Sequence, residues 1–299
     1  MAERGQRVLV IGATGALGAP LARSFARRGL VVRVMARDAG RLAQEFPDGF
    51  ERVAGDATSA GEIDKALDGC DGVHVSVAHG VDEAPAVEIV ARAAKRLGLR
   101  RISYVSGTSV CEANAGFPMI AAKLRAERVI EGCGVPFTIF RPTWFMEAVL
   151  NFFQHGGAYC FGRGDTRLHF LASEDFAEVV SRAYATRDSV NRGFRILGPE
   201  PIRMFDAIDR CRAALHPEIA SVTRLPIPVA KAIALLRGKG GVQMGLAASL
   251  VRYFEGISEG EAEADVERVL GRCTTTLSAW LQARRAAAHI ALKPADEYA

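Results

Sequence analysis

Short apolar runs alternate with longer segments of helical period through the first half of the chain. The runs are rich in β-branched residues and almost uninterrupted by polar ones, which is typical of strands covered on both faces. The pattern predicts strands at 7–11, 31–36, 50–54, 72–78, 101–106 and 136–141. It predicts helices between them at 15–28, 39–46, 59–68, 82–97 and 117–132. This alternation predicts an α/β fold built on a doubly wound parallel sheet.

The regular alternation ends after Arg141-Pro142. An aromatic-rich segment from Trp144 to Phe153 predicts a helix that leads into Gly156-Gly157. Beyond it the pattern predicts strands at 158–161, 167–171 and 193–197, and a helix at 173–187. Helices then dominate, at 203–215, 228–237, 242–255, 261–270 and 275–291, with one strand near 220–225. Gly198-Pro199-Glu200-Pro201 indicates a hinge before this last part.

The length of 299 residues fits one large domain or two modest ones. We expect a Rossmann domain over 1–142 and a mixed segment over 143–199 that returns to it and lines a substrate cleft. The remaining residues, 200–299, are expected to form a smaller, mainly helical substrate or lid region.

Composition removes several classes of protein. Hydrophobic residues at 49% and charged residues at 24% exclude a disordered chain. The net charge of +4 is spread along the chain, which argues against direct nucleic-acid binding. No apolar segment approaches the ~20 residues of a membrane span, and we expect a cytoplasmic protein, monomeric or homodimeric. The six cysteines lack metal-ligand spacing, so we expect free thiols and no metal.

Three of the 30 glycines lie in one turn between the first strand and the first helix. Gly12 suits a tight turn off the strand, Gly15 lets backbone approach a pyrophosphate, and Gly18 lets the helix pack closely on the sheet. The N-terminus of the helix then offers unpaired N–H groups to phosphates. The turn therefore predicts dinucleotide binding by Gly12, Ala13, Thr14, Gly15, Ala16, Leu17 and Gly18. Its Gly-x-x-Gly-x-x-Gly spacing resembles the extended and atypical short-chain dehydrogenase/reductase proteins.

The end of the second strand indicates which nucleotide binds. An acidic residue there would pair with the ribose hydroxyls of NAD, whereas an arginine suits a 2′-phosphate. Arg37 occupies this position, which favours NADP(H) over NAD(H). Two alternatives remain: Arg37 is a solvated charge paired with Asp38, or Asp38 is itself the NAD-type acid.

Short-chain dehydrogenases carry a hydroxyl residue on the fifth strand and Tyr-x-x-x-Lys on the next helix. In this chain Lys123 is present, but Met119 fills the tyrosine position and cannot transfer a proton. Lys123 shares a helical stripe with small and apolar residues, where a charge needs a polar or anionic partner. We therefore expect Lys123, with Thr108 or Ser106, to contact cofactor and stabilise charge on a substrate oxygen. The alternative is an i,i+4 pair between Lys123 and Glu127 on a solvated edge.

A longer run of residues resembles the NmrA-like, isoflavone-reductase-like branch of atypical short-chain dehydrogenases. The resemblance covers about residues 5–200, and its motifs are Lys123 with Glu127, Gly134-Val-Pro-Phe-Thr-Ile-Phe-Arg-Pro142 and Ser173-Glu-Asp-Phe-Ala177. It implies that Asp56 and Ala57, with Val77 and Ala78, contact the cofactor; alternatively Asp56 caps the helix near Ser59. Trp144, Phe145 and Tyr159 would line an apolar substrate pocket, although aromatic residues at this spacing also form cores.

Members of this branch are NADPH-dependent reductases or cofactor sensors. The leading prediction is an NADPH-dependent reductase that transfers hydride to a small apolar carbonyl, enone or quinone-like substrate. The alternative is a non-catalytic NADP(H)-binding redox sensor that contacts regulators. A sugar-nucleotide epimerase or dehydratase ranks third, because that chemistry relies on the tyrosine that Met119 replaces.

Overall fold

A computed structural model describes residues 5–77, 82–236, 242–255, 257, 259 and 264–291. Contacts between Cα atoms divide the chain into two compact units. Unit 1 contains the described residues up to Thr143, those from Ser173 to Leu197 and those from 264 to 273. Unit 2 contains the other described residues. The chain enters unit 2 after Thr143, returns to unit 1 at Ser173 and leaves it again after Leu197. Each unit is therefore built from segments that are separated along the sequence.

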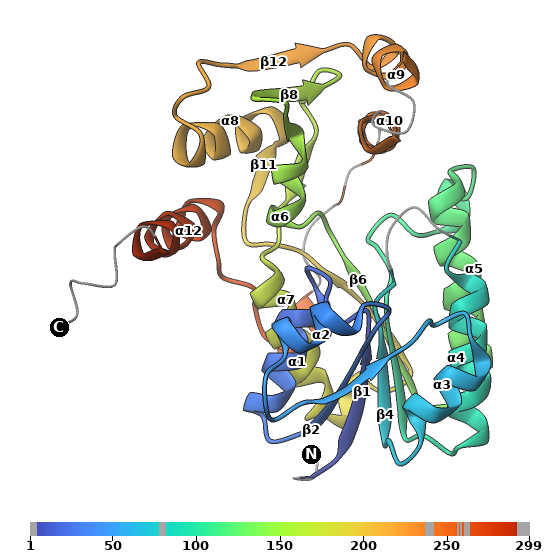
Figure 1. Cartoon of the computed structure of the whole chain (residues 1–299). Coiled ribbons are helices and arrows are strands. Elements are labelled where there is room, and N and C mark those ends of the chain that lie inside the picture. Colours follow the sequence, from blue (N-terminus) through green and yellow to red (C-terminus); the bar gives the residue numbers. More distant parts are fainter. Residues whose placement is uncertain are drawn as a thin grey trace, which may run out of the picture. The chain divides into compact units, whose positions relative to one another are not determined.

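Unit 1 is built on a seven-stranded sheet in which all pairs are parallel (Figure 1). The strands are β1 (Arg7–Ile11), β2 (Val31–Ala36), β3 (Glu51–Ala54), β4 (Gly72–Val75), β5 (Arg101–Val105), β6 (Phe137–Pro142) and β10 (Arg192–Ile196). Their order in space is β10-β6-β5-β4-β1-β2-β3. The predicted doubly wound Rossmann sheet is confirmed, and strand order reverses between β1 and β4, where such sheets bind ligands.

Helices cover both faces of this sheet, with α3, α4 and α5 on one face and α1 and α7 on the other (Figure 1). Their bounds, with those of the remaining helices of this unit, are α1 (Gly18–Arg27), α2 (Ala39–Glu45), α3 (Ala60–Leu67), α4 (Ala84–Arg96), α5 (Pro118–Gly132), α7 (Ser173–Tyr184) and α11 (Ala264–Leu270). Two short 3₁₀ turns, η1 (Glu112–Asn114) and η3 (Arg187–Ser189), complete the unit. Apolar strand residues such as Leu9, Val73 and Ile102 are fully buried, as continuous apolar runs predict.

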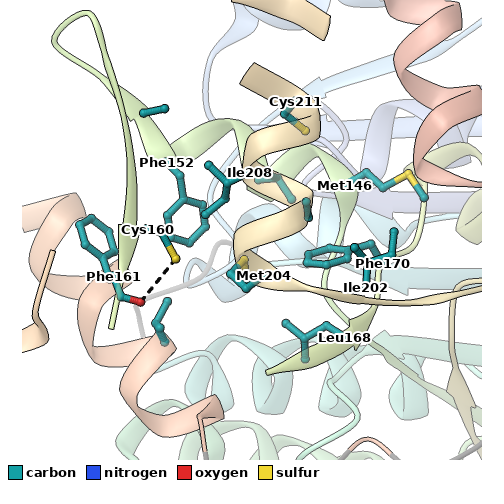
Figure 2. Close-up of a cluster of buried hydrophobic side chains, with 14 of the residues drawn as sticks. Met146, Phe152, Cys160, Phe161, Leu168, Phe170, Ile202, Met204, Ile208 and Cys211 are labelled. Atoms are coloured by element: carbon teal, nitrogen blue, oxygen red, sulfur yellow. Dashed lines mark hydrogen bonds between the residues drawn. The ribbon is translucent and has the colours of Figure 1, made fainter. Parts of the chain in front are cut away.

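Unit 2 combines short strands with helices. The strands β7 (Phe153–Gln154), β8 (Gly157–Phe161) and β12 (Val222–Leu225) form one small sheet, and β9 (Arg167–His169) pairs with β11 (Pro201–Arg203). The helices are α6 (Met146–Val149), η2 (Leu150–Phe152), α8 (Met204–Leu215), α9 (Ile227–Leu236), α10 (Val242–Phe254) and α12 (Leu277–Ala291). Figure 2 shows the apolar core that joins them, where Phe152, Cys160, Met204 and Ile208 point toward one another.

The predicted helix from Trp144 to Phe153 is wrong in its extent. The Leu171 N–H donates to the Trp144 oxygen at 2.9 Å, which keeps Trp144 extended beside Leu171. The helix α6 therefore begins only at Met146. The following residues turn back as a hairpin from β7 to β8. Both residues of this two-residue loop have positive φ, 50° at His155 and 75° at Gly156, as such hairpins require.

Candidate active site

The turn between β1 and α1 closes tightly on its surroundings. Gly12 has a φ of 77°, and a Cβ atom there would lie 1.9 Å from the backbone oxygen of Ser76. A Cβ atom on Gly18 would lie 2.3 Å from the Gly12 oxygen. Only glycine fits at these two positions without a shift of backbone. A Cβ atom on Gly15 would lie 3.2 Å from the Gly12 oxygen, so an alanine at this position would require a smaller shift of the backbone.

Unsatisfied N–H groups gather at the end of this turn. The first helical hydrogen bond runs from the Ala19 N–H to the Gly15 oxygen, at 3.2 Å. The N–H groups of Ala16, Leu17 and Gly18 precede it and therefore have no acceptor within the helix. Together with the positive end of the helix dipole, they suit an anion. The turn thus fits the pyrophosphate of a dinucleotide.

Hydrogen bonds to β2 and α2 hold the first residues of the turn. The N–H groups of Gly12 and Ala13 both donate to the Met35 oxygen, at 3.0 and 3.1 Å. The Thr14 oxygen accepts a hydrogen bond of 3.1 Å from Arg41 Nη2. The first half of the turn is therefore anchored to the β2–α2 segment, on which the nucleotide-selecting residue was predicted.

Arg37 and Asp38 follow the end of β2, and their contacts bear on whether the two side chains pair with each other. Arg37 follows the strand directly and is exposed. Asp38 caps α2, since its Oδ1 accepts the Arg41 N–H at 3.0 Å. In the described part of the chain, no ion pair joins Asp38 to Arg37. Arg41 is a second guanidinium beside the turn, which the sequence analysis missed because arginines at the start of a helix are common on surfaces.

Asp56 lies in the loop after β3 and shapes that loop. Its Oδ1 accepts hydrogen bonds from both the N–H and the hydroxyl of Thr58, each at 2.8 Å. These bonds, aided by the charge of Arg37, lower the pKa of the Asp56 carboxyl. Ala57 follows in the same loop. At the end of β4, Val77 is half-buried, while Ala78 lies outside the described residues.

Lys123 is buried, with 4% of the residue exposed. Its ammonium lies 2.8 Å from Glu83 Oε1 and donates to the Val105 oxygen at 3.1 Å, at the carboxyl end of β5. The expected inward orientation is therefore present. The alternative pair with Glu127 on a solvated edge is wrong: Glu127 is also buried, and it pairs with Arg141, whose Nε lies 2.9 Å from Glu127 Oε1.

Hydroxyl groups follow β5 toward the same edge of the sheet. Ser106 is buried, and its Oγ has no hydrogen-bond partner among the described residues. Thr108 is half-buried, and its N–H donates to the Pro142 oxygen at 3.0 Å. Tyr104 lies fully buried beneath Lys123, whose ammonium is 5.4 Å from the centre of its ring. Burial and the nearby Glu83 carboxylate raise the pKa of the Tyr104 phenol.

Adjacent strands in a sheet lie ~4.8 Å apart, so the end of β5, two strands from β1, is ~10 Å from the glycine turn. Both features open on the carboxyl edge of one parallel sheet. A family model described as NAD(P)H-binding matches residues 12–186, which include all of them. The chain belongs to this NAD(P)H-binding family. Within the family it falls in the NmrA-like, isoflavone-reductase-like branch of atypical short-chain dehydrogenases.

Individual proteins to which the chain is similar extend the comparison. The chain is 32% identical over 198 residues to a (4-alkanoyl-5-oxo-2,5-dihydrofuran-3-yl)methyl phosphate reductase of Streptomyces griseus, covering 65% of this chain and 69% of that protein. It is 28% identical to the uncharacterized oxidoreductase YesF of Bacillus subtilis, covering 95% of both chains. The NADP(H) complex of triphenylmethane reductase from Citrobacter sp. shares the fold, with a TM-score of 0.76 and 15% identity over 93% of this chain and 99% of that one. The chain is thus an oxidoreductase at the level of its family.

Among the predicted pocket residues of unit 2, the aromatic side chains take part in local packing. The Trp144 ring lies 5.4 Å from that of Phe254, edge to face, and 6.5 Å from that of Phe152. Phe145 is half-buried. The Tyr159 ring covers its neighbour Gly157, where a Cβ atom would lie 2.8 Å from the phenol oxygen. The role of Trp144, Phe145 and Tyr159 toward substrate stays a prediction.

Two negative findings concern only the described residues. They contain no group of three or more His, Cys, Asp and Glu side chains that could hold a metal ion. None of their helices has the length and apolar character that crossing a bilayer requires.

Glu83 is the second residue that sequence reasoning missed. It immediately precedes α4 and is 40 positions from Lys123, and no motif marks it. Its side chain is nevertheless as deeply buried as that of Lys123. A buried acid of this kind could be found from sequence only by asking which carboxylate neutralises a lysine on an apolar stripe.

Proposed function

We propose that this protein is an NADPH-dependent reductase of small apolar carbonyl, enone or quinone-like substrates. The observation that carries the proposal is the buried Lys123 ammonium at the end of β5, on the same sheet edge as the glycine turn. A buried cation at the ligand edge of such a sheet is suited to stabilise negative charge on a substrate oxygen. Membership of the NAD(P)H-binding family supports a nicotinamide cofactor as the hydride donor.

The cofactor, when bound, supplies a hydride to an electrophilic carbon. Gly12 to Gly18 would hold its pyrophosphate through backbone N–H groups, and Arg37 would bind the 2′-phosphate, with Asp56, Ala57, Val77 and Ala78 beside the nucleoside. Glu83 fixes the position of the Lys123 ammonium. The unpartnered Ser106 hydroxyl and Thr108 would orient the substrate oxygen or deliver a proton to it. Trp144, Phe145 and Tyr159 would contribute an apolar wall.

The function is tested with NADPH and a panel of quinones, enones, azo compounds and aldehydes. We expect turnover of at least one class, and a decrease in kcat of about 10²-fold or more when Lys123 becomes methionine. Lys123→Met alone would leave the Glu83 carboxylate buried without a partner. The variant is therefore combined with Glu83→Gln, so that neither charge is left buried without its partner.

If the double variant keeps the wild-type rate within twofold, Lys123 has no catalytic role. If no substrate exceeds background while NADPH still binds, the result favours a sensor of the cofactor over a reductase. That second function is favoured by one specific observation: the Lys123 ammonium already has a carboxylate partner.

Arg37 is expected to select NADPH over NADH. Loss of charge-assisted hydrogen bonds to the 2′-phosphate in Arg37→Ala should weaken NADPH binding about 10- to 100-fold. NADH carries no 2′-phosphate, so its Kd should change less than about threefold. Fluorescence titration of both nucleotides measures this, with Arg41→Ala as a second variant. Arg92→Ala is the control, because Arg92 is a highly exposed arginine on α4 that pairs with Glu88. Equal wild-type affinities for the two nucleotides would rule out the selection.

A further inference from the structure

A cavity of about 220 Å³ opens in unit 1 at the amino ends of the parallel strands. Gly72 and Arg101, which begin β4 and β5, line it together with Val8 of β1. Strands in a parallel sheet all run in one direction, so this edge is opposite to the glycine turn, which follows the carboxyl end of β1. The cavity is therefore separate from the candidate active site. Its remaining lining residues are Gln6, Asp71, Arg100, Tyr184, Thr186, Arg187 and Val190.

Arg101 is a buried cation in the wall of this cavity, with 8% of the residue exposed. Its Nη1 donates to the Ala183 oxygen at 2.6 Å, and its Nη2 donates to Ser189 Oγ at 2.9 Å. The guanidinium also lies 5.2 Å from the ring centre of Tyr184. All these partners are neutral, and no carboxylate of the described residues pairs with Arg101. The carbonyl oxygens at the end of α7 supply only partial negative charge.

Buried charges in proteins are normally paired with an opposite charge. The lining of the cavity adds positive charge instead of cancelling it, since Arg187 and Arg100 also face it. Arg187 is exposed, and its side chain makes no hydrogen bond or ion pair with the described residues. The one acid of the lining is Asp71, whose Oδ2 accepts the Arg7 N–H at 2.9 Å and whose Oδ1 lies 3.8 Å from Arg100 Nε. Asp71 therefore offsets part of the charge of Arg100, and Arg101 and Arg187 stay without a carboxylate partner among the described residues.

We propose that this cavity is a binding site for a small anion of the phosphate or carboxylate class, held by Arg101, Arg187 and Arg100. The volume is sufficient for one such group and a few waters, and the planar guanidinium groups match the oxygen atoms of phosphate and carboxylate. Arg101 provides the fixed, desolvated charge. Arg187 and Arg100 extend from the rim and complete the neutralisation of the ligand. The site does not depend on the proposed reductase activity.

Inorganic phosphate is the probe for a first test on the full chain. Thermal unfolding is followed in phosphate and in chloride at equal ionic strength, with no nucleotide present. We expect phosphate to raise the midpoint of the wild type by about 2 °C or more relative to chloride. Arg187→Ala removes an exposed side chain that makes no hydrogen bond or ion pair with the described residues, and it should lose at least half of this rise. Arg187→Ala/Arg100→Ala should lose nearly all of it. Arg101 is left intact because it ties β5 to the end of α7.

Two controls separate this site from other effects of phosphate. Arg92→Ala removes an exposed arginine outside the cavity, so it should keep the full rise if the loss in Arg187→Ala is specific. Arg37→Ala alters the predicted phosphate-binding residue of the nucleotide site and should also keep the rise. The proposal is overturned if phosphate does not stabilise the wild type, if Arg187→Ala keeps the full rise, or if Arg37→Ala alone abolishes it.

Discussion

Replacing Gly12 with alanine is expected to lower the free energy of unfolding by about 3 kcal/mol or more and to abolish binding of NADPH. Two effects add. A φ of 77° is strained for any residue with a Cβ atom, which costs ~1–2 kcal/mol. The new atom would also lie 1.9 Å from the Ser76 oxygen, so that β4 must move away from the turn. Urea unfolding and nucleotide titration measure the two losses.

Two other glycines separate these effects. Gly98 also has a positive φ, 67°, but a Cβ atom there would meet nothing within 4 Å. Gly98→Ala should therefore show only the backbone cost of ~1–2 kcal/mol, with NADPH binding unchanged. Gly15→Ala should leave unfolding nearly unchanged while NADPH binding weakens, because the methyl group would meet the pyrophosphate. If Gly12→Ala were no more destabilising than Gly98→Ala, the close approach of Ser76 would have no energetic importance.

Acidification from pH 6.5 to pH 4.5 is expected to destabilise the protein by ~2.5 kcal/mol through one histidine, His74. This side chain is fully buried on β4, its Nδ1 lies 2.9 Å from Ser103 Oγ, and its Nε2 has no partner among the described residues. Burial lowers the pKa of His74 to about 3. The folded protein therefore keeps the neutral ring at pH values where the unfolded chain, with a pKa near 6.5, binds a proton.

The sign and the window follow from these two pKa values. The contribution of His74 is complete above pH 6.5 and is lost progressively as the pH falls toward 3. Carboxylates affect stability at lower pH. Hydrogen bonds from Arg27, Ser24 and Arg28 lower the pKa of Glu178 to about 2, so its stabilising effect is lost mainly below pH 4.5. The interval from pH 6.5 to 4.5 therefore lies above most of the Glu178 titration, and comparison with a His74 variant assigns the response to His74.

Urea unfolding at several pH values tests this expectation. His74→Gln keeps a hydrogen-bonding group near Ser103 but cannot titrate, so the free energy of unfolding should lose most of its slope in this interval. His155→Gln is the control, because His155 is an exposed loop residue. An unchanged slope in His74→Gln would show that another group controls the acid response.

The main features of the fold follow from local sequence pattern. Each strand of the parallel sheet was predicted within a few residues, because continuous apolar runs can be buried on both faces only in such a sheet. The helix predicted from Trp144 to Phe153 forms only over Met146–Phe152, as α6 and η2, and its ends differ for a physical reason. At the first end the Leu171 N–H donates to the Trp144 oxygen, and at the other end β7 pairs with β8. Leu171 lies outside any local window around Trp144.

The sequence by itself determined the glycine turn and its place between β1 and α1, because the spacing of the three glycines is visible within seven consecutive positions. It also placed Lys123 on an inward helical stripe. Only the tertiary structure decided which acid neutralises Lys123 and that Arg101 lies buried without a counter-charge among the described residues. Such partners are far apart along the chain, and the order of strands in the sheet, which no single segment encodes, brings them together.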